Sequence, residues 1–278
     1  MKSNLAHFDD GNKKISARLL ERKKRIIDAN LDAISGKTIV DLASNNGRWS
    51  YAAIEAGATK VISIEGRQER IDDAKQYFSD LKVSDKIETN CGDMYHWLFE
   101  NADLRPDTVF CLGIYYHIMD HYFLLKQIAN LQPKTVIIDS GFVRSFRNSV
   151  HVQLENPDRH LNALKVHPDQ QAEFAGFVSL GLMIQMSWNL GYSCRPVIWD
   201  PAELDSPSSV QDYLMGRRYT LRLEKMDGHI DSDWKSSWRS ALKALNPKFE
   251  ILLDKEQHDF RIDDRVRSAM KSMEFSIM

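Results

Sequence analysis

Short apolar runs recur along the chain, separated by longer stretches in which apolar residues follow helical spacing. A continuous apolar run bounded by turn residues is typical of a strand buried on both faces. The expected strands are residues 38–42, 61–64, 87–90, 108–112, 135–139, 195–199 and 218–223. Because helical stretches alternate with the first five runs, we predict βαβ units and a Rossmann-like α/β fold: a seven-stranded, mostly parallel sheet with helices on both faces. The last two runs lie close together without a long helix between them, which predicts an antiparallel pair at one edge.

The same pattern divides the chain into three parts. Residues 1–36 form an N-terminal helical segment, residues 37–225 the sheet domain, and residues 226–278 a C-terminal appendage. Two insertions, near 143–169 and 201–216, leave the sheet at loop positions, where α/β domains carry their specificity. The first includes three histidines, and we interpret it as a lid or substrate segment.

The N-terminal segment holds the densest positive charge, between Lys13 and Arg25. A basic helix of this kind could contact an acidic substrate or RNA, or it could be the solvated face of a helix packed on the domain. The second interpretation is favoured, because the chain of 278 residues has a formal net charge of −2 and a pI near 6.5. Such a balance gives no general attraction to nucleic acid or anionic membranes.

The cysteines and the N-terminal sequence indicate in which cellular compartment we expect the protein. The three cysteines, Cys91, Cys111 and Cys194, have no CxxC spacing, which favours free thiols in a reducing environment. The N-terminal sequence MKSNLAHFDDGNKK lacks the apolar core of a signal peptide, and no run approaches a membrane span. We expect a soluble, cytoplasmic protein without a membrane partner.

The first strand is followed by a polar turn with one glycine, in the sequence "DLASNNGRWS". Asp41 ends the strand, Gly47 enters the helix, and Asn45 and Asn46 can adopt the left-handed angles of absent glycines. A diphosphate needs a row of bare backbone N–H groups, which side chains here would crowd. S-adenosylmethionine (SAM) carries no phosphate, and its amino-acid end needs partners for an ammonium and a carboxylate. The turn therefore favours SAM over a dinucleotide.

Acidic residues end the second and third expected strands. Glu65 lies 24 positions after Asp41, and an acid at this place accepts hydrogen bonds from both ribose hydroxyls of an adenosyl group. Asp93 can accept from the adenine amine, while Met94 packs on the ring. All three follow strands whose carboxyl ends meet at one edge of a parallel sheet, where such folds bind ligands.

The fourth expected strand leads into "LGIYYHIMD". With "DLASNNGRWS", "ISIEGR" and "CGD", this run resembles class I SAM-dependent methyltransferases over residues 37–223. It is most similar to the branch that contains the tRNA uridine carboxymethyltransferases and their small-molecule relatives. The resemblance implies that Glu65 binds the ribose, and Asp93 with Met94 the adenine. It also implies a methionine-end group: Asp41, Ser44, Asn46, Gly47, Leu112, Gly113 and Tyr116. Ala43 and Asn45 depart from the family, which usually has glycine at these positions.

Methyl transfer from a sulfonium is an in-line displacement that needs no metal, so the protein has to align the acceptor and in some cases remove a proton. His117 is the candidate base, with Tyr116 beside it; a capping role for this histidine is the alternative. Tyr115, Arg144, Arg147 and His151 are candidates for binding the acceptor, although one of the two tyrosines is expected to face the core.

The histidines of the first insertion also raise a metal hypothesis. His151, His160 and His167 are spaced by nine and seven residues, and Glu155 and Asp158 could add oxygen ligands. These spacings match no helical or hairpin ligand pattern, so we predict no metal site.

These observations predict a SAM-dependent methyltransferase that acts on oxygen, nitrogen or sulfur of a small molecule. One alternative is a tRNA-modifying methyl- or carboxymethyltransferase, whose case is weakened by the missing basic face. Another is a SAM-binding module that has lost catalysis.

Overall fold

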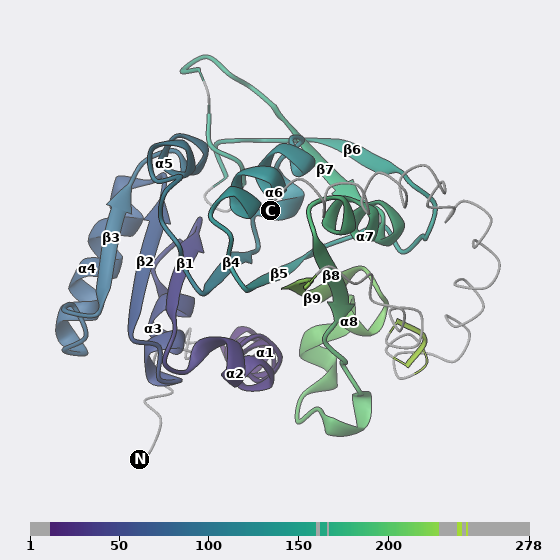
Figure 1. Ribbon diagram of the computed structural model, residues 1–278, viewed down its shortest axis with the longest axis horizontal. Helices are drawn as coiled ribbons and strands as arrows, with labels where there is room; N and C mark the ends of the chain where they lie inside the picture. The colour runs from purple at the N-terminus through teal and green to yellow at the C-terminus, as the bar shows by residue number, and fades with distance from the viewer. Residues whose placement is uncertain (1–11, 160–161, 166, 228–237, 241–242, 244–278) are drawn as a thin grey trace.

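The computed structural model describes residues 12–159, 162–165, 167–227, 238–240 and 243. Its centre is a seven-stranded sheet with the order β3-β2-β1-β4-β5-β9-β8 (Figure 1). The strands of this sheet are β1 (Thr38–Leu42), β2 (Lys60–Glu65), β3 (Ile87–Cys91), β4 (Thr108–Leu112), β5 (Thr135–Gly141), β8 (Tyr192–Pro196) and β9 (Arg218–Lys225). β1 to β5 pair in parallel, and β9 runs antiparallel to both β5 and β8. The predicted fold class is confirmed.

Helices cover both faces of this sheet. The α-helices are α1 (Lys13–Ile26), α2 (Leu31–Ile34), α3 (Arg48–Glu55), α4 (Gln68–Asp80), α5 (Met94–Glu100), α6 (His121–Asn130), α7 (Leu180–Asn189) and α8 (Gln211–Leu214). Short 3₁₀ turns are η2 (Asp28–Asn30), η3 (Tyr115–His117), η4 (Pro201–Glu203) and η5 (Pro207–Val210).

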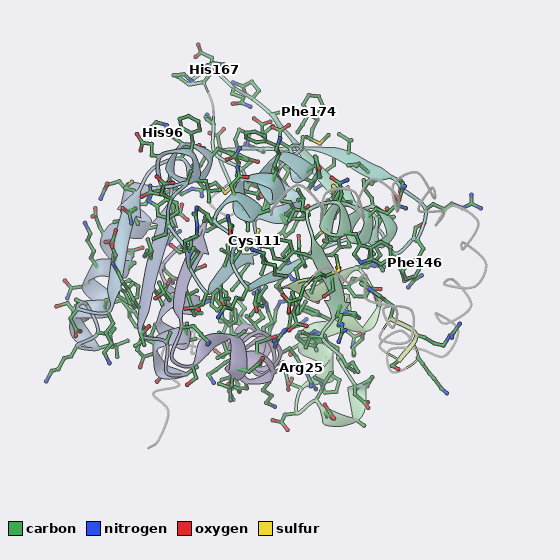
Figure 2. All side chains as sticks on the ribbon, in the orientation of Figure 1. Arg25, His96, Cys111, Phe146, His167 and Phe174 are labelled. Atoms are coloured by element: carbon green, nitrogen blue, oxygen red, sulfur yellow. The ribbon has the colours of Figure 1, made fainter. Side chains whose placement is uncertain are left out.

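Alternate strand residues enter two separate cores. In β4, Val109 and Cys111 pack with α5, α6 and α7, whereas Phe110 and Leu112 pack with α1 to α4. This alternation is what a strand with period two requires when both of its faces are covered. Figure 2 shows the resulting burial of Cys111 in the interior, where it is fully enclosed.

The predicted outer segments join these cores where the structure describes them. Leu19 and Ile26 of α1 are buried in the core beneath α3 and α4. From the predicted appendage, Trp238 is fully buried and its Nε1 donates to the carbonyl of Cys194 at 3.0 Å. Most of the appendage lies outside the described residues. The three-part division stays a prediction.

Two local expectations need correction. The edge strand expected at 195–199 is β8 and lies at Tyr192–Pro196, because its pairing with β9 begins at Tyr192 opposite Lys225. The first insertion holds a hairpin that the apolar pattern did not predict, formed by β6 (Val150–Glu155) and β7 (Glu173–Val178). Here "the arm" means β6, β7 and the described residues between them. It lies on the side where β1 and β3 end (Figure 1).

Candidate functional site

A cavity of about 560 Å³ opens at the carboxyl ends of the parallel strands. This volume lies within the ~300–1,000 Å³ typical of small-molecule sites. Its wall combines the ends of β2 and β3, the segment after β4, and the arm. The lining residues are Ala43, Ile64, Glu65, Gly66, Arg67, Gly92, Asp93, Met94, Tyr95, Ile114, His117, Ile118, Met119, Asp120, Asn162, Ala163, Leu164, Lys165, Glu173 and Phe174. Of the predicted site residues, the cavity therefore brings together Glu65, Asp93, Met94 and His117.

The turn after β1 adopts the backbone of a glycine-rich loop without its glycines. Ala43, Asn45 and Gly47 have φ values of 54°, 53° and 73°, all in the left-handed region. Asn tolerates these angles because its side chain bonds locally, and Asn45 Oδ1 accepts from the N–H of Asn46 at 2.8 Å. At Gly47 a Cβ would overlap the ring of Phe78, so only glycine fits. The two positions that depart from the family's glycines thus keep a glycine-like conformation.

Glu65 is almost completely buried at the end of β2, with 3% of its surface exposed. Its Oε2 accepts from the N–H of Asn45 at 2.9 Å, and its Oε1 accepts from the N–H of Arg67 at 3.0 Å. A carboxylate oxygen has two lone pairs, so each of these bonds leaves one for a ligand in the cavity. The acid therefore links the turn after β1 to the cavity wall.

Asp93 and Met94 form the next part of this wall. Asp93 caps α5, because its Oδ1 accepts from the N–H groups of Tyr95 and His96, both at 2.9 Å. Among the described residues no partner is recorded for Oδ2, which leaves this oxygen for a donor group on a ligand. Met94, Ile64 and Ala43 give the same region an apolar surface that fits a flat ring.

Asp41 and Ser44 lie deeper than the sequence predicts. Asp41 is 1% exposed and accepts from Ser50 Oγ at 2.6 Å, while Ser44 Oγ accepts from Ser63 Oγ at 2.7 Å. Burial raises the pKa of Asp41 to about 7, and the nearby Glu65 adds to the rise, against the bond from Ser50. Neither residue lines the cavity, and nor do Asn46, Gly47, Leu112 and Gly113.

The segment after β4 holds two adjacent tyrosines whose side chains point in different directions. Tyr115 is fully buried, with its ring against His121 and Phe142, so its predicted contact with the acceptor is wrong. A core position explains the orientation, because an aromatic ring contributes a large apolar area when it is buried. Tyr116 points the other way and stacks on Phe177 of β7 with ring centroids 5.5 Å apart. The half-buried Tyr116 ring lies beside His117, centroid to centroid 4.0 Å, but does not line the cavity.

His117 reaches the cavity and forms a buried pair with the arm. Its Nδ1 lies 2.6 Å from Oε2 of Glu155, and the two side chains are 7% and 8% exposed. Burial lowers the pKa of His117, and Arg218 and Arg67 lower it further, whereas the bond to Glu155 raises it. Sequence analysis noted Glu155 only as an oxygen ligand for a metal and missed this partnership.

The arm also contacts the wall that Glu65 builds. Arg67 Nη2 donates to the carbonyl of Asn162 at 2.6 Å, and its Nη1 lies 3.5 Å from Oε1 of Glu65. Leu164 packs so closely on Gly66 that no side chain could replace this glycine without a shift. Figure 2 shows Phe174 and His167 on the same side of the molecule, farther out on the arm. The lid interpretation of residues 143–169 stays a prediction; within this segment, residues 162–165 line the cavity.

A second buried charge cluster surrounds Asp139 at the end of β5. Its carboxylate accepts from Arg22 at 2.9 Å, Arg218 Nε at 2.7 Å, and the hydroxyls of Tyr213 and Thr220 at 2.8 Å. Burial alone would raise the pKa of Asp139, but Arg218 and Arg22 hold it below its usual value. Sequence analysis missed the cluster, whose members come from α1, β5, α8 and β9.

Arg218 extends this cluster toward the candidate site. Its guanidinium lies over the ring of Tyr116, 5.5 Å from the centroid, and beside Gly113. Two arginines against one aspartate leave a net positive charge next to the end of β4. This charge suits an anionic group bound there.

The remaining predicted acceptor ligands are outside the cavity. Arg144 is exposed and donates to the carbonyl of Met215 at 2.8 Å, Arg147 is exposed, and His151 is exposed on β6. None of the three lines the cavity, so their predicted contact with an acceptor there is not supported. Within the described ranges no cluster of three or more His, Cys, Asp or Glu side chains could hold a metal ion; His160 lies outside them.

Five of the seven basic residues of α1 pair with acids of the same chain. Arg18 pairs with Asp212 at 2.6 Å, Arg22 with Asp139, Lys23 with Asp28 at 2.8 Å, Lys24 with Asp205 at 2.5 Å and Arg25 with Glu203 at 2.9 Å. Internal pairing of this kind offsets much of the helix's positive charge and fits the interpretation of a packed, solvated face. In the part of the chain that the structure describes, no helix is long and apolar enough to span a membrane.

Comparison with known proteins agrees with this architecture. No family model matches the chain. A tRNA U34 carboxymethyltransferase from Campylobacter lari is 25% identical over 131 residues, which cover 45% of this chain and 42% of that protein. The match thus spans less than half of the relative's length.

Solved structures show the same fold at lower identity. The N-terminal domain of EvdMO1 with SAH bound has a TM-score of 0.54 and 18% identity over 72% of this chain and 79% of that one. A SAM-dependent methyltransferase from Mesorhizobium loti has a TM-score of 0.52 and 12% identity, with coverages of 71% and 95%. The magnesium protoporphyrin IX methyltransferase from Synechocystis PCC 6803 with SAM bound has a TM-score of 0.50 and 13% identity, with coverages of 81% and 92%. The chain has the fold of the class I SAM-dependent methyltransferases.

Proposed function

We propose that the protein is a SAM-dependent methyltransferase whose acceptor is a small molecule with a reactive oxygen, nitrogen or sulfur. The observation that carries the proposal is the buried carboxylate of Glu65, which ends β2 on the wall of the cavity. An acid at this position is what the two hydroxyls of a ribose need, and Asp93 and Met94, at the start of α5 after the neighbouring strand, suit an adenine.

The residues present fit this donor better than a dinucleotide. Ala43 and Asn45 of the turn after β1 adopt glycine-like angles but keep their side chains, where a diphosphate needs bare backbone N–H groups. When bound, SAM supplies an electrophilic methyl group on a positively charged sulfur. The chain's own part is to hold the adenosyl group along Glu65 and Asp93 and to direct the methyl group toward the segment after β4.

The acceptor would occupy the rest of the cavity, between the segment after β4 and the arm. Ile114, Ile118, Met119 and Phe174 give this region apolar surface, beside the charged Asp120, Lys165 and Glu173. His117 lines this region and directly follows Tyr116, which the resemblance places near the methionine end of the donor. A small acceptor is also supported by the internal ion pairs of α1, which leave little free positive charge for a nucleic acid.

Calorimetric titration with SAM and, separately, with NAD tests the donor. We expect micromolar binding of SAM and none of NAD. Glu65→Ala should weaken SAM binding by about 1.5–3 kcal/mol for each charge-assisted hydrogen bond lost, about 10- to 150-fold in Kd. Glu88→Ala is the matched control, because this exposed glutamate lies on neighbouring β3 and, among the described residues, pairs with Lys60 and Asn90. Unchanged affinity in folded Glu65→Ala would remove the ribose assignment.

A tRNA-modifying methyl- or carboxymethyltransferase is the second candidate. It is favoured by the similarity to the Campylobacter lari enzyme, and the net positive charge of Arg218 and Arg22 beside Gly113 suits a donor with an extra carboxylate. Parallel assays with labelled SAM, small acids, amines, thiols and bulk tRNA separate the two. Transfer of label to tRNA alone would replace the small-molecule proposal. SAM binding without transfer to any acceptor would favour the non-catalytic alternative.

A further inference from the structure

The pair between His117 and Glu155 has the arrangement of a base and the group that orients it. The two side chains come from elements far apart in the sequence, η3 and β6, and meet in a buried position with 2.6 Å between Nδ1 and Oε2. Gln153 Nε2 lies 3.3 Å from the other carboxylate oxygen of Glu155, so the carboxylate is held from both sides. A contact this short and enclosed fixes the ring of His117.

This contact also decides which ring nitrogen carries the proton. A carboxylate accepts hydrogen bonds, so Nδ1 of the neutral ring has to be the N–H, and Nε2 carries the lone pair. The described residues give Nε2 no hydrogen-bond partner, and His117 lines the cavity. The nearby His121 provides the opposite case, because its Nε2 lies 2.8 Å from the carbonyl of Gly176 and therefore carries the proton.

We propose that Glu155 positions His117 to accept a proton from the acceptor, and that the acceptor class is a hydroxyl or other protic nucleophile on an apolar frame. This inference rests on the proposed methyltransferase function. The apolar frame follows from Ile114, Ile118 and Phe174, which line the same cavity as His117. Glu155 acts through the histidine and is a positioning residue, whereas His117 contacts the acceptor.

With a hydroxyl acceptor, methyl transfer releases one proton, which His117 accepts. The acceptor oxygen forms the bond to the methyl carbon as the carbon–sulfur bond breaks, and that bonding pair returns to sulfur. The hydroxyl proton passes to Nε2 of His117, and the imidazolium is stabilised by Glu155 until the proton leaves to solvent. An acceptor that is already deprotonated, or that has no proton to lose, would gain nothing from this pair.

The charged groups around His117 set the direction of its titration. Glu155 on β6 raises the pKa of His117, whereas Arg218 on β9 and Arg67 after β2 lower it, as does burial. Tyr116 on the same 3₁₀ turn contacts the ring. Replacing Glu155 by glutamine keeps an acceptor for Nδ1 but removes the charge, so the pKa of His117 should fall.

Nitrogen NMR of the imidazole rings tests the pair without any substrate. In the wild type, His117 should show the Nδ1–H tautomer and His121 the Nε2–H tautomer. Glu155→Gln should lower the pKa of His117 and leave that of His121 unchanged, and Glu155→Leu should remove the tautomer preference. Identical His117 spectra in the wild type and both variants would overturn the proposal.

Kinetics with an identified acceptor supply the second readout. Glu155→Gln should lower kcat by at least about tenfold with little change in KM, and His117→Asn by about 10²–10⁴-fold. The acid limb of the kcat profile should move to lower pH in Glu155→Gln but not in the control Glu88→Gln. A loss of thermal stability with an unmoved acid limb would reduce Glu155 to a structural residue. Absence of SAM binding in the wild type would remove the proposed function and leave the NMR test of the pair intact.

Discussion

Asp41 offers a test of the site's electrostatics that depends only on folding. The carboxyl group is completely enclosed at the end of β1, and a single hydroxyl, that of Ser50, donates to it. Because burial disfavours the charged form, the pKa of Asp41 rises from 3.8 to about 7. The folded protein therefore holds a proton at Asp41 between about pH 4 and pH 7 that the unfolded chain has already lost.

The sign and size of the effect on stability follow from this difference. A carboxyl group whose pKa is raised on folding contributes fully below the unfolded pKa, and the contribution is lost as pH rises through the folded pKa. A shift of about three units corresponds to about 4 kcal/mol, at about 1.4 kcal/mol per unit, and this is an upper bound because a buried charge attracts water and relaxes. The loss should be complete slightly above pH 7.

Urea unfolding of the wild type and of Asp41→Asn at pH 5, 6, 7 and 8 measures this loss of stability. Asparagine keeps an oxygen for the Ser50 hydroxyl and cannot ionise, while all other groups titrate in both proteins. The wild type should therefore lose stability relative to the variant as the pH rises, by up to about 3 kcal/mol between pH 5 and pH 8, because about two pH units of the titration range lie above pH 5. Two stability curves that run parallel over this range would refute the buried, protonated Asp41.

Three further substitutions test other parts of the site and its support. Ala43→Gly should stabilise the protein by about 0.5–1 kcal/mol in urea unfolding, because an alanine in the left-handed region is strained; an equal loss would mean that the strain is absent. Asp139→Asn should destabilise the protein by about 3–5 kcal/mol at pH 7, because it leaves Arg218 without its anion. The difference from the wild type should shrink as the pH falls below about 4, since the lowered pKa of Asp139 favours folding only above the pKa of the unfolded chain. Gly181→Ala should lower the thermal midpoint, because a Cβ there would overlap the backbone of Phe146; an unchanged midpoint would contradict that packing.

The sheet was predictable because its strands are buried on both faces. The expected strands at 38–42 and 108–112 coincide with β1 and β4, which are continuous apolar runs. The apolar pattern did not predict β6, because all of its residues but Glu155 are exposed and it contains no apolar run. Its pairing with β7 becomes evident only when the arm is seen in three dimensions.

The site residues likewise fall into those that the sheet topology places and those that only tertiary packing places. Glu65 ends β2, and Asp93 and His117 come a few residues after β3 and β4, so the topology alone brings them to one edge. Glu155 and Arg218 reach the region from β6 and β9, and nothing in their local sequence marks the contact. Tyr115 and Tyr116 are adjacent in a 3₁₀ turn, and tertiary packing decided that the first faces the core.

The arm connects the two ends of the proposed reaction. Through Asn162 and Leu164 it contacts Arg67 and Gly66, next to the wall predicted for the donor, and through Glu155 it holds the candidate base. A displacement of this hairpin would therefore open the donor wall and release His117 together. Because both contacts come from one insertion between β5 and α7, we expect the enclosure of the donor and the orientation of the base to change together. We therefore predict that a substitution in the arm that changes which acceptor is used will also change the affinity for SAM.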